Sequence, residues 1–92
     1  MIESFRNRSL KRLFERGDRS RIQPAFVDKV ERILARLDAA TAVEDCDAPG
    51  FGLHSLRGDL ARFWAITVSR NWRVIFRFED GNALDVDLVD YH

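Results

Sequence analysis

The hydrophobic period changes near Leu53, and this change limits the fold more than any other feature of the sequence. Before it, apolar residues recur at the 3.6-residue spacing of an α-helix. After it, they alternate with a period of two, which is typical of strands. A chain of 92 residues has room for one core. We therefore expect a single α+β domain over residues 1–92, with two N-terminal helices packed on a small antiparallel sheet.

Two helices are predicted in the first half of the chain. The first covers residues 8–16 and should end at Gly17, because glycine readily adopts the left-handed conformation that often follows a helix. The second should begin at Pro24, whose missing N–H would be unpaired in a first turn anyway, and should fade near Ala40. Its apolar positions form one broad face, which comprises Phe26, Val27, Val30, Ile33, Leu34 and Leu37.

A short strand over residues 1–5 and a meander after residue 53 should form the sheet, and strand residues alternate between its two faces. The face under the helices is expected to hold even-numbered residues, namely Trp64, Ile66, Val68, Trp72, Val74, Phe76, Phe78, Leu84, Val86 and Leu88. The other face is expected to be uncovered and to hold odd-numbered residues, namely Phe63, Ala65, Thr67, Arg73, Ile75, Arg77, Ala83, Asp85, Asp87, Val89 and Tyr91.

The turns must preserve this alternation, so each hairpin loop should have an odd number of residues. Three-residue loops that end at Asn71 and Gly81 satisfy this condition, with these two residues in the left-handed conformation. In that register Trp72 lies between Val68 and Leu88.

Charge is distributed unevenly, although 15 basic and 15 acidic residues cancel. Residues 1–36 carry ten Lys or Arg and five acids, whereas residues 37–92 carry five arginines and ten acids. Such a chain lacks the overall positive charge of a general polyanion binder. It can still offer a basic face to RNA and a different face to a protein partner. A solvated helix surface would explain the same charges.

Several classes of protein are disfavoured. A single cysteine, Cys46, cannot build a disulfide framework or a cysteine zinc cluster, and Asp45 and Asp47 should raise the pKa of its thiol. The sequence shows no metal-ligand spacing and no glycine-rich phosphate loop, so we expect no metal and no cofactor. It shows no apolar stretch near the ~20 residues of a membrane span and no signal segment. We therefore expect a cytoplasmic protein without membrane contact.

Four side chains could together cleave RNA if they converge: His54, Arg73, Tyr91 and His92. In metal-independent cleavage the ribose 2′-hydroxyl attacks the neighbouring phosphate. This reaction requires a base, an acid for the leaving 5′-oxygen and a cation for the phosphoryl oxygens. Histidine titrates near neutrality, arginine binds phosphate through a planar fork, and tyrosine can stack on a base or orient the nucleophile.

Each of these residues also has a purely structural explanation. Arg73 would face Asp87 directly in the predicted register, so a cross-strand salt bridge would account for it. His54 lies next to a turn and could be an ordinary strand residue, and Tyr91 could be a rim aromatic. His92, at the end of the sequence, could be frayed and inert.

Short motifs over nearly the whole chain point to one family. They are Met-Ile-Glu-Ser-Phe at residues 1–5, Leu-Phe-Glu-Arg-Gly at 13–17, Leu-Asp-Ala-Ala-Thr at 37–41, Leu53-His54 with Gly58-Asp59, Trp64-Ala65-Ile66, Asn71-Trp72-Arg73 with Phe76-Arg77-Phe78, and Asp90-Tyr91-His92. The last of these, after an Asn-Trp-Arg strand start, is the most specific. By these motifs the sequence resembles the HigB toxins of bacterial type II toxin–antitoxin modules, a branch of the RelE/ParE superfamily.

The resemblance implies a RelE/ParE-like fold and an endonuclease that cuts mRNA in the A site of the 70S ribosome. It carries His54, Arg73, Tyr91 and His92 over as catalytic positions. It also implies inhibition by a HigA-type helix-turn-helix antitoxin, with operator DNA bound only through the toxin–antitoxin complex.

Other basic residues should bind RNA. We expect Arg57 and Arg77 to contact the substrate. The residues expected to contact ribosomal RNA are Arg6, Arg8, Lys11, Arg12, Arg16, Arg19 and Arg21.

The sequence departs from the family pattern at two positions. Arg57 stands where many relatives have lysine, and arginine transfers protons poorly because its pKa stays above ~12. Phe63 stands where tyrosine is common, so a hydroxyl is lost. Two other functions stay open: a noncatalytic toxin that inhibits DNA gyrase, like the ParE branch, and an inactive antitoxin-binding corepressor module.

Overall fold

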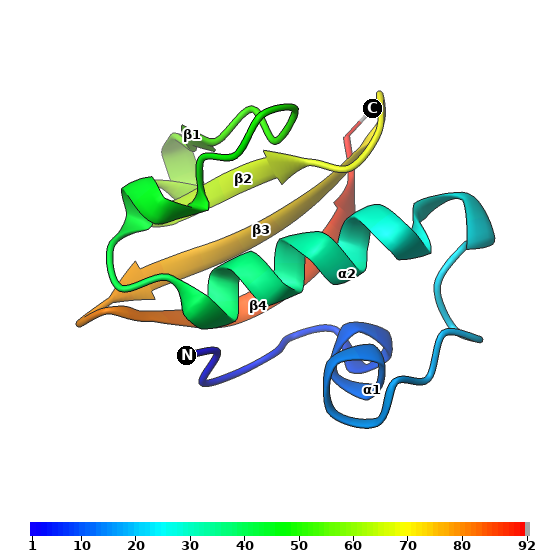
Figure 1. Cartoon of the computed structure of the whole chain (residues 1–92). Helices are drawn as coiled ribbons and strands as arrows, with labels where there is room; N and C mark the ends of the chain where they lie inside the picture. Colours follow the sequence, from blue (N-terminus) through cyan, green and yellow to red (C-terminus); the bar gives the residue numbers. More distant parts are fainter. Residues whose placement is uncertain (92) are drawn as a thin grey trace.

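The computed structural model describes residues 1–91, so His92 lies outside the described part of the chain. Helices α1 (Arg8–Arg16) and α2 (Pro24–Ala39) precede an antiparallel sheet in the order β1-β2-β3-β4. The strands are β1 (His54–Ser55), β2 (Phe63–Thr67), β3 (Trp72–Glu79) and β4 (Asn82–Asp90), and the connections contain the short 3-10 helices η1 (Val43–Cys46) and η2 (Gly58–Leu60). Figure 1 shows α2 crossing one face of the sheet, with α1 beside it. The predicted α+β fold is confirmed.

Both helices begin and end close to where the sequence predicts. The Asn7 side chain caps α1 by accepting a hydrogen bond from the Leu10 N–H at 3.0 Å. Gly17 follows α1 with a φ of 67°, and its N–H bonds to the Leu13 carbonyl. Helix α2 starts at Pro24, where the absent N–H leaves no donor unsatisfied.

The larger core lies between the helices and one face of the sheet, called here the helix face. Phe76, at the middle of β3, is fully buried in this core. The other buried strand residues on this face are Ile66, Val68, Val74, Ala83 and Val86, and they meet the apolar sides of both helices. Burial of apolar surface, at about 25 cal/mol per Å², therefore holds the two layers together.

The other face of the sheet, called here the opposite face, carries a smaller core. Phe63, Ala65 and Ile75 are buried there, packed against Leu56 and Leu60. The two leucines belong to the segment of β1 and η2, which pairs with the edge of β2. The prediction of an uncovered face is therefore wrong in part. Alternation could not reveal this cover, because β1 contains only two residues.

The β2–β3 register is the predicted one. Thr67 pairs with Arg73, and the Val68 N–H donates to the Trp72 carbonyl at 2.9 Å. The expected left-handed conformation of Asn71 is wrong, because its φ is not positive. The loop thus keeps the predicted pairing with a different backbone path.

The β3–β4 turn differs from the prediction. It consists of two residues, Asp80 and Gly81, whose φ values of 52° and 79° suit the tight turn of a two-residue hairpin. Phe78 therefore pairs with Ala83, which lies in the larger core, while Leu84 pairs with Arg77 on the opposite face. The predicted faces of Ala83 and Leu84 are both wrong.

A bulge then restores the predicted alternation. Asp85 has a φ of 53° and lies where the register shifts between Ile75 and Arg77. Beyond it Val86 and Leu88 face the helices as predicted. The predicted pairing of Trp72 with Leu88 is wrong by two residues, since Trp72 pairs with Asp90.

Residues 1–6 run parallel to β4 along its free edge. Ile2 and Phe5 form isolated bridges with Ala83 and Val86, so the predicted N-terminal strand exists only as two short contacts. The Ser4 hydroxyl oxygen accepts a hydrogen bond from the Asp85 N–H at 2.8 Å. The N-terminal segment therefore satisfies the backbone donor that the bulge removes from the sheet.

Candidate active site

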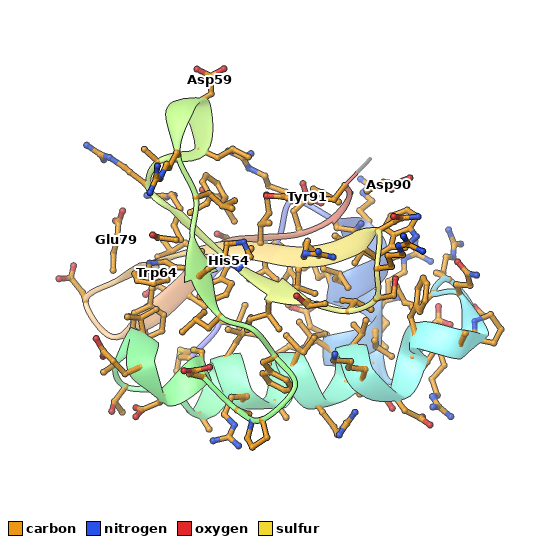
Figure 2. All side chains as sticks on the ribbon, turned by 90° about the horizontal axis from the view of Figure 1, so that it is seen from above. His54, Asp59, Trp64, Glu79, Asp90 and Tyr91 are labelled. Carbon is orange, nitrogen blue, oxygen red and sulfur yellow. The ribbon has the colours of Figure 1, made fainter. Side chains whose placement is uncertain are left out.

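The start of β3 and the end of β4 bring Arg73 and Tyr91 together on the opposite face. Arg73 pairs with Val89, which makes Tyr91 its diagonal neighbour. The Tyr91 N–H donates to the Asn71 carbonyl and fixes the end of β4 beside the β2–β3 loop. The central guanidinium carbon of Arg73 lies 5.2 Å from the centre of the Tyr91 ring, a cation–π contact. Figure 2 shows α2 on one side of the sheet and Tyr91 on the other.

Backbone carbonyls orient the Arg73 guanidinium. Nη1 donates to the carbonyls of Ser69, Arg70 and Trp72 at 2.6, 3.2 and 3.1 Å. Nε is buried and has no hydrogen-bond partner within residues 1–91. Since buried polar groups nearly always have a partner, this unpaired N–H is an exception, and it lies at the candidate site. These hydrogen bonds could not be predicted from the sequence, because every residue type has a backbone carbonyl.

The salt bridge predicted between Arg73 and Asp87 is wrong. The bulge shifts the register, so Asp87 pairs with Ile75, and its carboxylate accepts the Leu88 N–H at 2.8 Å. Asp85 instead binds Arg77, whose Nε donates to it at 2.8 Å. The structural explanation for Arg73 that the sequence offered is therefore removed.

His54 lies on the same face at the far edge of the sheet. It pairs with Ala65, which pairs with Ile75, so one strand separates β1 from β3. By strand spacing and rise, its Cα lies about 12 Å from that of Arg73. Figure 2 shows His54 well separated from Tyr91. The structure thus brings Arg73 and Tyr91 together and places His54 as a separate group on the same face.

A hydrogen bond selects one tautomer of His54. Its Nδ1 lies 2.9 Å from the carbonyl oxygen of Gly52. Because a carbonyl can only accept, Nδ1 carries a proton, and Nε2 of the neutral ring is free to accept one. The residue is exposed, so a substrate can reach this nitrogen.

The two predicted substrate-binding arginines differ in their surroundings. Arg57 is exposed and directly precedes η2. Arg77 donates hydrogen bonds to Asp85 and Glu79, and the Asp85 bond raises the pKa of Arg77 above its usual value. Two of its three guanidinium nitrogens, Nε and Nη1, are therefore already bound to carboxylates. His92, the fourth predicted catalytic residue, lies outside the described residues.

The residues predicted to bind ribosomal RNA fall into separate groups. The α1 basic surface lines a shallow hollow together with Glu15 and consists of Arg8, Lys11, Arg12 and Arg16. Arg19 forms ion pairs with Asp28 and Glu31. Arg21 lines a pocket beside Phe26 and Trp72.

Arg6 lies apart from these groups. It precedes α1, and its guanidinium carbon lies 4.9 Å from the centre of the Phe63 ring on the opposite face. No sequence pattern indicated this contact, because Arg6 and Phe63 are distant in the chain.

The single cysteine of the chain is poorly reactive. Cys46 is fully buried, and burial together with Asp45 raises the pKa of its thiol to about 11. The predicted direction is confirmed, with burial as the larger cause, and the protonated thiol is a poor nucleophile. Within residues 1–91 no three His, Cys, Asp or Glu side chains are grouped to hold a metal ion. Nor does that part contain a helix long and apolar enough to cross a membrane.

The fold is also found in a solved structure. A chain of the YoeB–YefM complex from Staphylococcus aureus superposes with a TM-score of 0.63, covering 100% of this chain and 98% of that chain at 14% sequence identity. At this identity the likeness concerns the fold alone.

The sequence then identifies the family. A family model described as the RelE-like toxin of type II toxin–antitoxin system HigB matches residues 3–92, so the chain belongs to the HigB-like toxins. It is 39% identical over 92 residues to Endoribonuclease HigB of Proteus vulgaris, with 100% of both chains covered. It is 33% identical over 90 residues to Toxin HigB-1 of Vibrio cholerae serotype O1, covering 96% of this chain and 95% of that protein.

Proposed function

We propose that the protein is an endoribonuclease toxin that cleaves mRNA in the ribosomal A site without a metal ion. The reaction is attack of a ribose 2′-hydroxyl on the adjacent phosphate, with departure of the 5′-oxygen. The full-length similarity to Endoribonuclease HigB of Proteus vulgaris supports this activity. A HigA-type helix-turn-helix antitoxin is its proposed inhibitor, since the family consists of toxins of type II toxin–antitoxin systems.

The fixed guanidinium of Arg73 is the observation that carries the proposal. Three carbonyls hold its Nη1, the Tyr91 ring stacks against it, and its Nε has no partner within residues 1–91. Negative charge builds up on the phosphoryl oxygens as the 2′-oxygen attacks. A donor that is already oriented stabilises this charge without reorganisation, and losing one such donor typically costs about 10²–10³ in rate.

Two histidines and a tyrosine complete the proposed chemistry. In the neutral ring of His54, the bond from Nδ1 to the Gly52 carbonyl leaves Nε2 as the acceptor, which suits a base that accepts the 2′ proton. His92, the residue after Tyr91 in the sequence, is the second proposed proton-transfer group. The Tyr91 ring is 39% exposed and can stack on a codon base or orient the nucleophile.

Binding to the ribosome is assigned to a different surface. The α1 basic surface belongs to the helical layer, whereas Arg73 and Tyr91 lie beyond the sheet. It would contact ribosomal RNA through phosphate, as arginine-rich surfaces do. Arg57 is the proposed contact to the substrate from the η2 side.

The test is to map mRNA 5′ ends after induction of the parent, Arg73→Ala, Tyr91→Ala and His92→Ala, with and without active translation. For the parent, cuts in phase with the codons are expected only while translation continues. For Arg73→Ala, cleavage should be reduced by about a hundredfold or more. Arg32→Ala, a matched charge change on the exposed side of α2, is the control and should cut like the parent. In a reconstituted ribosome assay, a 2′-deoxy sugar at the cut position should block cleavage.

Three results would contradict the proposal. One is cleavage of the 2′-deoxy message, which would exclude attack by the 2′-hydroxyl. Another is undiminished cutting by both Arg73→Ala and His92→Ala. A DNA-damage response that precedes any fall in protein synthesis would favour gyrase inhibition instead.

A further inference from the structure

Arg6 is brought to the opposite face by the N-terminal segment. Its backbone N–H donates to the Val86 carbonyl at 2.9 Å, so its main chain lies at the free edge of β4. Its guanidinium nevertheless lies over the Phe63 ring of β2, with a guanidinium-to-ring distance of 4.9 Å. The side chain therefore extends across the sheet on the same face as Arg73 and Tyr91.

The contact with Phe63 holds the guanidinium of Arg6 in place. Phe63 is 6% exposed and belongs to the small core of the opposite face, so it is a rigid support. A guanidinium whose central carbon lies over a ring uses none of its N–H donors in a hydrogen bond to that ring's edge, so they can bind phosphate in a bidentate manner. Arg6 is itself exposed, so these donors can be reached.

The neighbouring arginine does not offer the same capacity. Arg77, the strand partner of Phe63, is bound by Asp85 and Glu79. The ion pairs found within residues 1–91 do not include Arg6. At this end of the opposite face, Arg6 is therefore the better-placed cation for an anionic ligand.

We propose that Arg6 binds a phosphate of the same RNA strand that Arg73 cleaves, but at a different nucleotide. This inference rests on the proposed function, because it assumes that RNA lies on the opposite face. Phe63, beneath Arg6, lies four positions along β2 from Thr67, the strand partner of Arg73. At the rise of a β-strand this separation is about 13 Å, too far for both arginines to hold one phosphate. Arg6 is thus a positioning residue that fixes the path of the strand.

A thermodynamic cycle tests the inference. Single phosphates of an mRNA are replaced in turn by uncharged methylphosphonates, beginning at the cut site, and cleavage on programmed ribosomes is measured for the parent and for Arg6→Met. The methionine keeps apolar cover over Phe63 but removes the charge. We expect Arg6→Met to raise KM by roughly tenfold while kcat changes little, because it removes one charge-assisted phosphate contact.

The cycle also predicts which phosphate is involved. At one phosphate away from the cut site, the methylphosphonate should raise the KM of the parent. The same methylphosphonate should not raise the KM of Arg6→Met any further. Arg6→Lys should recover only part of the loss, because lysine keeps the charge but lacks the planar fork, and the slope of log affinity against log salt concentration should fall by about 0.7 for Arg6→Met. Arg32→Met, which removes one charge from the helical side, should show neither effect.

The outcomes separate two failures. If the parent cleaves no message, the proposed function fails. If the parent cleaves but Arg6→Met behaves like Arg32→Met at every phosphate, only the role of Arg6 is overturned. A lower melting temperature without coupling to any phosphate would mean that Arg6 merely stabilises Phe63, and would also overturn it.

Discussion

The two faces of the sheet use different interactions. The helix face is packed with apolar residues from both helices, and Ile66, Val74 and Phe76 are completely buried. The opposite face has a core of three buried residues, and beyond it polar groups that bind backbone carbonyls, carboxylates or aromatic rings. A single sheet thus has the larger apolar core on one side and the candidate site on the other.

The surroundings of Arg73 illustrate the contrast between the two faces. Arg73 binds backbone carbonyls and contacts the Tyr91 ring, while its buried Nε has no partner within residues 1–91, which costs stability. The residues behind it in β3, Val74 and Phe76, anchor the same strand in the larger core. Substitutions on the two faces should therefore separate stability from activity.

The largest effect is expected on the helix face. Phe76→Ala should lower the free energy of unfolding by about 3–5 kcal/mol, because it opens a cavity in the larger core. Urea denaturation followed by tryptophan fluorescence would measure it. A loss below about 1 kcal/mol would mean that the helix face does not dominate stability.

Arg73→Ala should give the reverse pattern. Cleavage should fall by about 10²–10³, while the free energy of unfolding changes little, because removal of an unsatisfied buried donor offsets the loss of the carbonyl hydrogen bonds. Tyr91→Phe is a matched variant on the same face, because it removes the Tyr91 hydroxyl but keeps the ring that contacts Arg73. Should Arg73→Ala unfold the protein as readily as Phe76→Ala, the proposed division between the faces would be wrong.

A smaller effect is expected where the faces are connected through the bulge. Ser4→Ala removes the hydroxyl that accepts the Asp85 N–H, so it should cost about 1–3 kcal/mol of unfolding free energy. Amide exchange at Asp85 should become faster, and the protection of the Val74 amide should fall only in proportion to global stability. Unchanged exchange at Asp85 would show that water replaces the hydroxyl.

The smallest effect concerns the segment that leads from the helices to the opposite face. Hydrogen bonds from the Thr41 and Ala42 N–H groups lower the pKa of Asp45 below its usual 3.8. A lowered pKa in the folded state stabilises the protein above pH 3.8, and this contribution disappears as the pH falls through the folded-state value. Asp45→Asn should therefore lose less stability than the parent between pH 5 and 3. Equal acid dependence in denaturation would argue against this role.

Elements with strong local signals were predictable from the sequence. Gly17 and Pro24 marked helix ends, and alternation gave the correct faces for β2 and β3. The β3–β4 hairpin was not, because a two-residue turn followed by a bulge gives nearly the same apolar pattern as a three-residue loop. The two turns differ only in the faces of Ala83, which is buried in the larger core, and Leu84, which lies half-buried on the opposite face.

The candidate site divides in the same way. Residue types and motifs singled out Arg73 and Tyr91, which the structure places in contact. The carbonyls that hold Arg73, and the reach of Arg6 to Phe63, depend on backbone paths and on contacts between distant segments. Neither leaves a periodic pattern in a single sequence.

The bulge at Asp85 also determines which changes of length β4 can accept. An even-numbered turn and one extra bulge residue together leave Tyr91 on the same side as Arg73. Deleting any one residue between the turn and the tail would rotate the last residues of β4 by half a period and send the tyrosine ring toward the helices. Insertions and deletions in this strand should therefore be tolerated in pairs, and relatives whose tails differ by a single residue must compensate with a second bulge or by losing this one.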